Sequence, residues 1–236
     1  MSKAVSVSNA IPDYLAGVNL PEFKLTDLQI PRMNICQAMT PQRKKADPSY
    51  VSGLEEGQFF NSVTGSNYTA EVDVTVLKVW PSRVKFYAKT SGASGLECHS
   101  PNGATGGLLS ASCASCVHSQ WEGRTPPACC DQENFLLWVD GAPVLFSAKM
   151  ASLKDARRWK TQIAVGGVAY YGLRWKLATV PHSTTKGDFY GFRASSHGYV
   201  TAEEAVMYAE LCDRFRSFGS GERMDHLADV EVPTAF

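Results

Sequence analysis

Five of the seven cysteines in this chain of 236 residues fall between positions 98 and 130, in a segment rich in Gly, Ser and Pro. The stretch CHSPNGATGGLLSASCASC, residues 98–116, carries three of them and one histidine among few side chains that could fill a core. Cysteines grouped in this way serve a metal site, a set of disulfides or a reactive thiol.

The spacing favours a metal site. Cys113-Ala-Ser-Cys116 has the two intervening residues that let both sulfurs meet one tetrahedral ion, and Cys98 precedes this pair. Cys129 and Cys130 follow it, and because adjacent cysteines rarely both bind one ion, only one of them is expected to be a ligand. A structural Zn²⁺ is therefore predicted, which would hold together a long loop with little apolar content. The candidate ligands are Cys98, Cys113, Cys116 and either Cys129 or Cys130, with His99 and His118 as substitutes.

The competing kinds of chemistry find less support. Disulfides would need export, and the N-terminus MSKAVSVSNAIPDYL has no basic start or continuous apolar segment of a secretion signal. No histidine precedes a glutamate by two residues, which disfavours a zinc deaminase, and phosphate-loop, H-E-x-x-H and G-x-S-x-G motifs are absent from the sequence. We therefore expect a protein that is not an enzyme.

The bulk composition indicates a globular protein with one large domain. Hydrophobic residues make up 44% of the chain, and no apolar run reaches the roughly 20 residues that a membrane span needs. The expectation is a soluble cytoplasmic protein without membrane contact.

Alternating apolar residues predict pairs of short antiparallel strands. One hairpin is expected from 71–79 and 83–87 around a Trp80-Pro81-Ser82 turn, and a second within 135–148 around Asp140-Gly141. A third is expected within 168–193, around the polar turn HSTTKGD. Helices are predicted at 151–164 and 201–219, each beginning with a capping-box pattern.

These elements predict a mainly β fold with flanking helices: an OB-like antiparallel barrel that carries a zinc-ribbon-type insertion. The expected organisation is an N-terminal arm at 1–30, the barrel at 31–200 with the insertion at about 91–133, a helix at 201–221 and an acidic tail at 222–236. The tail holds four acids and one base, which leaves 22 bases against 19 acids in the rest of the chain.

Basic and aromatic side chains recur together on the predicted strands. A surface for single-stranded nucleic acid needs flat side chains that stack on bases and cations that neutralise phosphates. The candidates are Arg83, Lys85, Tyr87, Arg157, Arg158, Tyr170, Arg174, Lys176, Tyr190 and Phe192.

Several segments together resemble the tailed-phage single-stranded DNA-binding proteins of the T-even type. They are EEGQFFNSVTGSNY, the stretch EVDVTVLKV with RVKFY, the cysteine motifs with Trp121, and VLFSAKMASLKDARRW. The C-terminus DVEVPTAF is similar to the tails with which such proteins recruit replication partners. In the T-even type the zinc ligands are one histidine and three cysteines, whereas this chain offers a cysteine at each expected place.

The resemblance implies an OB fold and sequence-independent binding of single-stranded DNA during phage replication or recombination, with replication proteins as partners of the tail. One alternative is a zinc-ribbon phage factor that docks on another protein, for example on transcription machinery. Another is an enzyme of unrecognised type with His182 or His197 in a cleft.

Overall fold

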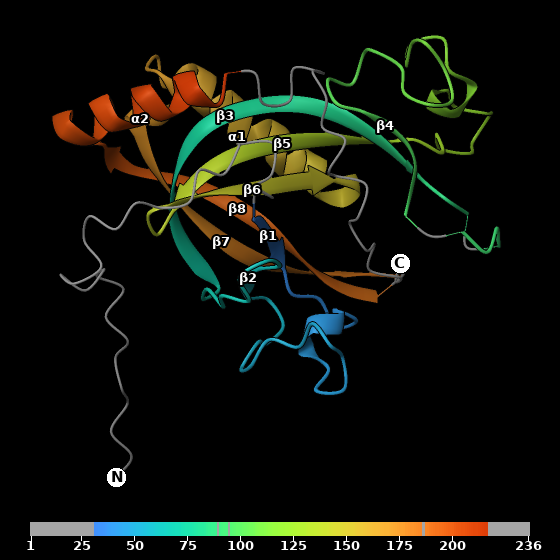
Figure 1. The fold of residues 1–236 in the computed structure, drawn as a ribbon, viewed down its shortest axis with the longest axis horizontal. Coiled ribbons are helices and arrows are strands. Elements are labelled where there is room, and N and C mark those ends of the chain that lie inside the picture. The colour runs from blue at the N-terminus through green and yellow to red at the C-terminus, as the bar shows by residue number, and fades with distance from the viewer. Residues whose placement is uncertain (1–30, 89, 94, 186, 217–236) are drawn as a thin grey trace, which may run out of the picture.

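The computed structural model describes residues 31–88, 90–93, 95–185 and 187–216. The expected N-terminal arm and acidic tail lie outside these residues. The described part is mainly β, as predicted: one curled sheet forms a half-barrel and two α-helices pack on it (Figure 1).

The sheet has eight strands in the order β2-β1-β6-β5-β3-β7-β8, with β4 pairing β3 beside this path. The strands are β1 (Arg32–Ile35), β2 (Phe59–Asn61), β3 (Glu71–Phe86), β4 (Leu96–Ser100), β5 (Cys130–Val139), β6 (Ala142–Lys149), β7 (Leu173–Thr184) and β8 (Gly187–Tyr199). The pair β1 and β6 is parallel, and the other pairings are antiparallel.

The predicted hairpin at 71–87 is wrong, because these residues form the single 16-residue strand β3, which arches over the sheet in Figure 1. Among the described strands, β7 pairs the first part of β3 up to Thr75, and β4 pairs it again only from Arg83. Pro81 lies between these two pairings and faces Glu133 of β5 on its other side. At Pro81, one edge of β3 therefore has no hydrogen-bonded neighbouring strand among the described strands. Because proline has no N–H to donate on that edge, its presence does not interrupt the sheet.

The other two hairpins are confirmed. Asp140 and Gly141 have φ values of 48° and 83°, which fit a tight two-residue turn between β5 and β6. β7 and β8 run further into the predicted turn than expected, to Thr184 and Gly187, and β8 also continues past residue 193 to Tyr199. The first of these strands begins only at Leu173, so Tyr170 lies in a short 3-10 helix (Tyr170–Gly172) before it, contrary to the prediction.

The inner face of the curled sheet holds the main core. Phe146 of β6 meets Phe192 of β8 edge to face at 4.9 Å across the half-barrel, and Trp159 stacks on Phe135 at 4.3 Å. Trp159 comes from α1 (Leu153–Val165), which buries Ala156, Trp159 and Ile163 against this core. The helix thereby covers the inner face of the sheet.

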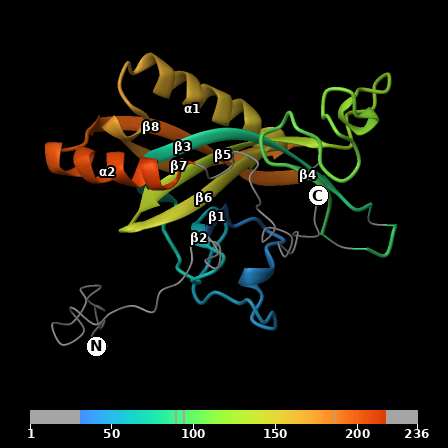
Figure 2. The ribbon, with the colours of Figure 1, turned by 45° about the horizontal axis from the view of Figure 1, so that its top comes forward.

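The opposite face of the sheet carries a second core cluster around α2 (Ala202–Arg214). Tyr208 of this helix packs with Leu77, Trp80, Leu136 and Leu145. Its predicted capping box is confirmed at Thr201 and Glu204. At α1 the predicted box is wrong, because Ser152 makes no side-chain cap hydrogen bond and is itself the last residue of the short 3-10 helix Met150–Ser152. Figure 2 shows the two helices at separate places along the sheet.

Candidate metal centre and nucleic-acid interface

Four of the five clustered cysteines line one small cavity in the insertion between β3 and β5. They are Cys98, Cys113, Cys116 and Cys129. Burial raises the pKa of the Cys129 thiol, the nearby Ser119 hydroxyl lowers it, and the proximity of the three other cysteines raises it again. The structure thus gathers thiols that are up to 31 positions apart around one point.

Strand alternation decides which of the two adjacent cysteines faces the cavity. Lys85 of β3 pairs with Cys98, whereas Val84 pairs with both His99 of β4 and Cys130 of β5. Directly paired residues share one face of a sheet and neighbours along a strand alternate. Cys130 and His99 therefore lie on the face opposite to Cys98, and Cys129, next to Cys130, joins Cys98 at the cavity.

Backbone contacts fold the insertion tightly around these thiols. A Cβ atom at Gly107 would lie 2.3 Å from the His99 carbonyl oxygen and 2.9 Å from Cys98 Sγ, so only glycine fits there. The Cys113 N–H donates to the Ala104 carbonyl at 3.0 Å, and the Cys129 N–H donates to the His118 carbonyl at 2.9 Å. The chain reversals that bring the four cysteines together are therefore held by the backbone itself.

The thiols do not form a ready-made metal geometry. Within the residues that the structure describes, no group of three or more His, Cys, Asp or Glu side chains is arranged so that it could hold a metal ion as it stands. The donor chemistry nevertheless suits Zn²⁺, since four sulfur ligands make up a structural zinc site.

The basic residues predicted on strands are engaged with carboxylates. Arg83 forms an ion pair with Asp131 at 2.6 Å and Lys85 with Glu97. On the other face of the sheet, Arg174 pairs with Glu204 at 2.6 Å and Lys176 with Glu71 at 3.5 Å. The hydrogen bond with Glu204 raises the pKa of the Arg174 guanidinium. These four cations therefore occupy two opposite faces rather than one continuous surface.

The predicted aromatic residues are also dispersed. Phe192 is 1% exposed in the main core and is not accessible for stacking. Tyr190 is half-buried, and its ring packs over Gly57, where a Cβ would approach to 2.6 Å. Tyr87 and Tyr170 are 40% and 50% exposed, and Arg157 and Arg158 of α1 are also exposed.

The outer face of β3, β5 and β6 carries polar residues that the sequence did not single out. Asn134 Nδ2 donates to Ser82 Oγ at 2.8 Å, and Ser147 Oγ donates to Asn134 Oδ1 at 2.7 Å. Ser82 Oγ also donates to Gln132 Oε1 at 3.1 Å. These four residues form a row of uncharged polar groups across three strands, which we call the polar row.

Two cations lie at one end of the polar row. Lys149 is the last residue of β6, pairs with Gln132, and has its Nζ 5.0 Å from the centre of the Phe86 ring. Burial lowers its pKa, the Cys130 thiol raises it, and the charge of Arg32 lowers it again. Burial also lowers the pKa of Arg32, which lies on β1 beside β6. No sequence pattern indicates this pair, because only the sheet brings the two residues together.

Residues 16–224 match the family model of the Pam3 phage gp34-like proteins. The chain belongs to this family. No curated protein and no solved structure matches it.

The match makes this chain a phage protein, and it spans every element of the gp34-like fold described above. All of the cysteines at the cavity, the polar row and its two cations lie within the matched residues. Among the described residues, no helix is long and apolar enough to cross a membrane.

A second hollow of this gp34-like protein lies between α1 and the β7–β8 pair. Its lining includes Asp155, Arg158, Gln162, His182 and Arg193. His182 stacks on Phe189 with ring centres 5.0 Å apart. The other histidine considered from the sequence, His197, lies 3.4 Å from Asp73 on the surface.

Proposed function

We propose that this phage protein binds single-stranded DNA without sequence preference and protects it during phage replication or recombination, and that it is not an enzyme. The observation that carries the proposal is the order of five strands, β6-β5-β3-β7-β8, with α1 connecting β6 to β7. Counted along the chain, β3 is the first strand of this set and lies at its centre, between the second and the fourth. We take this order as support for an OB-type barrel, the partly open five-stranded Greek-key barrel that binds oligonucleotides in other proteins.

The position of the insertion agrees with such a role. In OB folds the face of the second and third strands and the loops between strands one and two and between strands four and five bind oligonucleotides. Here β5 and β6 provide that face, the cysteine insertion is the loop between β3 and β5, and the turn from Thr184 to Gly187 joins β7 to β8. In Figure 1 the insertion projects from one end of the sheet, beyond β4.

Zinc belongs to the same proposal. Cys98, Cys113, Cys116 and Cys129 would hold a structural Zn²⁺ and draw together to the Zn–S distance of about 2.3 Å. Metal binding would then contribute folding free energy to an insertion that has few buried apolar residues of its own. The ion would take no part in chemistry, since four protein ligands leave no open position.

Fluorescence titration with an arbitrary-sequence oligonucleotide at two salt concentrations tests the function. Cations that neutralise phosphates make the affinity fall steeply as the salt concentration rises. On a single strand, each contacted phosphate adds roughly 0.7 to the steepness of the plot of log affinity against log salt concentration. We expect tight binding that is independent of sequence, sensitive to salt and accompanied by quenching of Trp emission. Absence of binding at low salt would refute the proposal.

A protein-docking role for the insertion is the second candidate, and one observation favours it. Leu108, Val117 and Trp121 of the insertion are 88%, 76% and 67% exposed. Large exposed apolar side chains are typical of contact sites for other macromolecules. If the protein docks on a protein partner instead of DNA, the unchanged protein will capture that partner and will not bind the oligonucleotide. Replacing these three residues by Ser will then abolish capture of the partner, and the variant will still not bind the oligonucleotide.

A further inference from the structure

We propose that Arg32 and Lys149, together with the ring of Phe86, form a subsite for a backbone phosphate of the single strand and its adjoining base. The inference rests on the proposed function and names a contact region within it. It also moves the expected contact from the carboxylate-paired cations of β3 and β7 to the outer face of β1, β6 and β3.

The first support is the geometry of the sheet. Arg32 pairs with Leu145 of β6, and Leu145 belongs to the outer core cluster around α2. Lys149 is four residues further along β6 and therefore points to the same face. Val84, two residues before Phe86, pairs with Cys130, and Cys130 is close enough to Lys149 to affect its pKa. Three strands thus direct the three side chains to one region.

The second support is the electrostatic situation of the two cations. Neither Arg32 nor Lys149 forms an ion pair or a side-chain hydrogen bond with any residue in the described ranges 31–88, 90–93, 95–185 and 187–216. Both side chains are half-buried, and the positive charge of Arg32 acts on Lys149. Two neighbouring cations that are partly removed from water and lack a counter-charge raise the free energy of the free protein. An anion placed between them would remove this cost, and a phosphodiester provides one.

The third support is the neighbourhood. The Phe86 ring lies beside Lys149, so a base next to the bound phosphate would meet an aromatic surface, and base–aromatic stacking tolerates any sequence. The polar row of Ser82, Gln132, Asn134 and Ser147 continues from Lys149 across β5 to β3. Ser82 and Asn134 are buried within this row, whereas Gln132 and Ser147 are only partly buried. These two residues present an amide and a hydroxyl group, and neither is a carboxylate that would repel the DNA backbone.

The test compares two double variants that remove the same charge. Arg32→Gln with Lys149→Gln removes the subsite, and Lys44→Gln with Lys45→Gln removes two exposed cations from the loop after β1. The titration uses a dT oligonucleotide at several salt concentrations, and thermal melting of each variant checks that it is folded. Loss of one or two phosphate contacts predicts a salt slope that is smaller by about 0.7 to 1.4 and an affinity at low salt that is weaker by roughly tenfold or more.

The control variant should keep the slope of the unchanged protein within error. If the unchanged protein binds the oligonucleotide and the Arg32/Lys149 variant binds it with the same slope and affinity, the subsite is refuted while the proposed function stands. If the unchanged protein does not bind, both fall. Competition with inorganic triphosphate tests whether the subsite binds a nucleic-acid backbone or free phosphate. If triphosphate displaces the oligonucleotide at equal phosphate concentration, the subsite is a site for free phosphate, and the assignment to a nucleic-acid backbone is overturned.

Discussion

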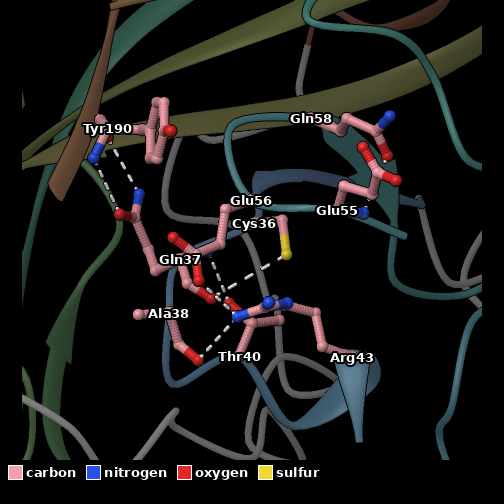
Figure 3. A network of polar contacts seen from close by, with 9 residues as sticks. All are labelled: Cys36, Gln37, Ala38, Thr40, Arg43, Glu55, Glu56, Gln58 and Tyr190. Carbon is pink, nitrogen blue, oxygen red and sulfur yellow. Dashed lines mark hydrogen bonds and ion pairs between the residues drawn. The ribbon is translucent and has the colours of Figure 1, made fainter. Parts of the chain in front are cut away.

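The side-chain amide of Gln37 forms hydrogen bonds with both backbone polar groups of Tyr190. Its Nε2 donates to the Tyr190 carbonyl at 2.9 Å, and the Tyr190 N–H donates to its Oε1 at 2.8 Å (Figure 3). The amide therefore pairs with the backbone of β8 through one donor and one acceptor, as the peptide group of a neighbouring strand would. It links the segment after β1, which is next to the end strand β2 in the strand order, to β8 at the other end.

Replacing Gln37 by Ala should destabilise the fold. The change removes two hydrogen bonds and leaves both backbone groups of Tyr190 without this partner, so the free energy of unfolding should fall by about 1 to 3 kcal/mol. Urea unfolding followed by Trp fluorescence measures this difference.

Gln58→Ala is the matched control for this prediction. Among the residues that the structure describes, Gln58 Oε1 accepts a hydrogen bond only from the nearby Glu55 N–H, at 2.8 Å, and so links no distant elements. Its replacement should cost less than half as much as Gln37→Ala. Equal losses for both variants would show that the bridge to Tyr190 contributes nothing special to stability.

The two helix starts offer a second matched pair. Thr201 Oγ1 accepts from the Glu204 N–H at 3.2 Å and the Thr201 N–H donates to the Glu204 carboxylate at 2.7 Å, whereas Ser152 caps nothing. Thr201→Ala should therefore lower the free energy of unfolding by about 1 kcal/mol, and Ser152→Ala by clearly less. Thermal melting of both variants checks the difference, and the reverse order would contradict the structural assignment of the caps.

Local patterns predicted the turn between β5 and β6 and the start of α2 correctly, because the causes of these features are local. Asp140-Gly141 can adopt the positive φ values of a tight turn, and Thr201 and Glu204 are three residues apart. Pro81 misled the prediction, because whether a proline breaks a strand depends on which neighbour its N–H would have faced. That neighbour is defined by the distant strands β4 and β7.

In the candidate sites, too, local features were predictable from the sequence and pairings between distant strands were not. The cysteine spacing indicated a four-thiol cluster but left Cys129 and Cys130 equivalent, and only the register of β3 with β4 and β5 separates them. Arg83 and Lys85 look like free cations in the sequence, yet Asp131 and Glu97 neutralise them across strands. Pairings between distant positions cannot be read from one sequence, because nothing local specifies the register.

The register leads to a prediction about metal content. If zinc binds at the cysteine cavity, Cys129→Ser should lower the zinc content of purified protein from about one equivalent to near zero and make the insertion sensitive to proteolysis, since metal binding and folding are coupled there. Cys130→Ser is the matched control and should retain the metal, because Cys130 faces Lys149 on the other side of the sheet. Zinc content by atomic absorption decides, and loss of metal in the Cys130 variant alone would reverse the assignment.

Removal of residues 222–236 should strengthen DNA binding. This segment carries four acids and one base, so its negative charge can compete with phosphates for the cations of the DNA-binding surface. The truncated protein should bind the oligonucleotide several-fold more tightly at low salt, and the gain should shrink as salt screens the competition. A variant with Glu222, Asp225, Asp229 and Glu231 changed to their amides keeps the length and should show the same gain. Unchanged affinity in both proteins would mean that the tail does not act on the DNA site.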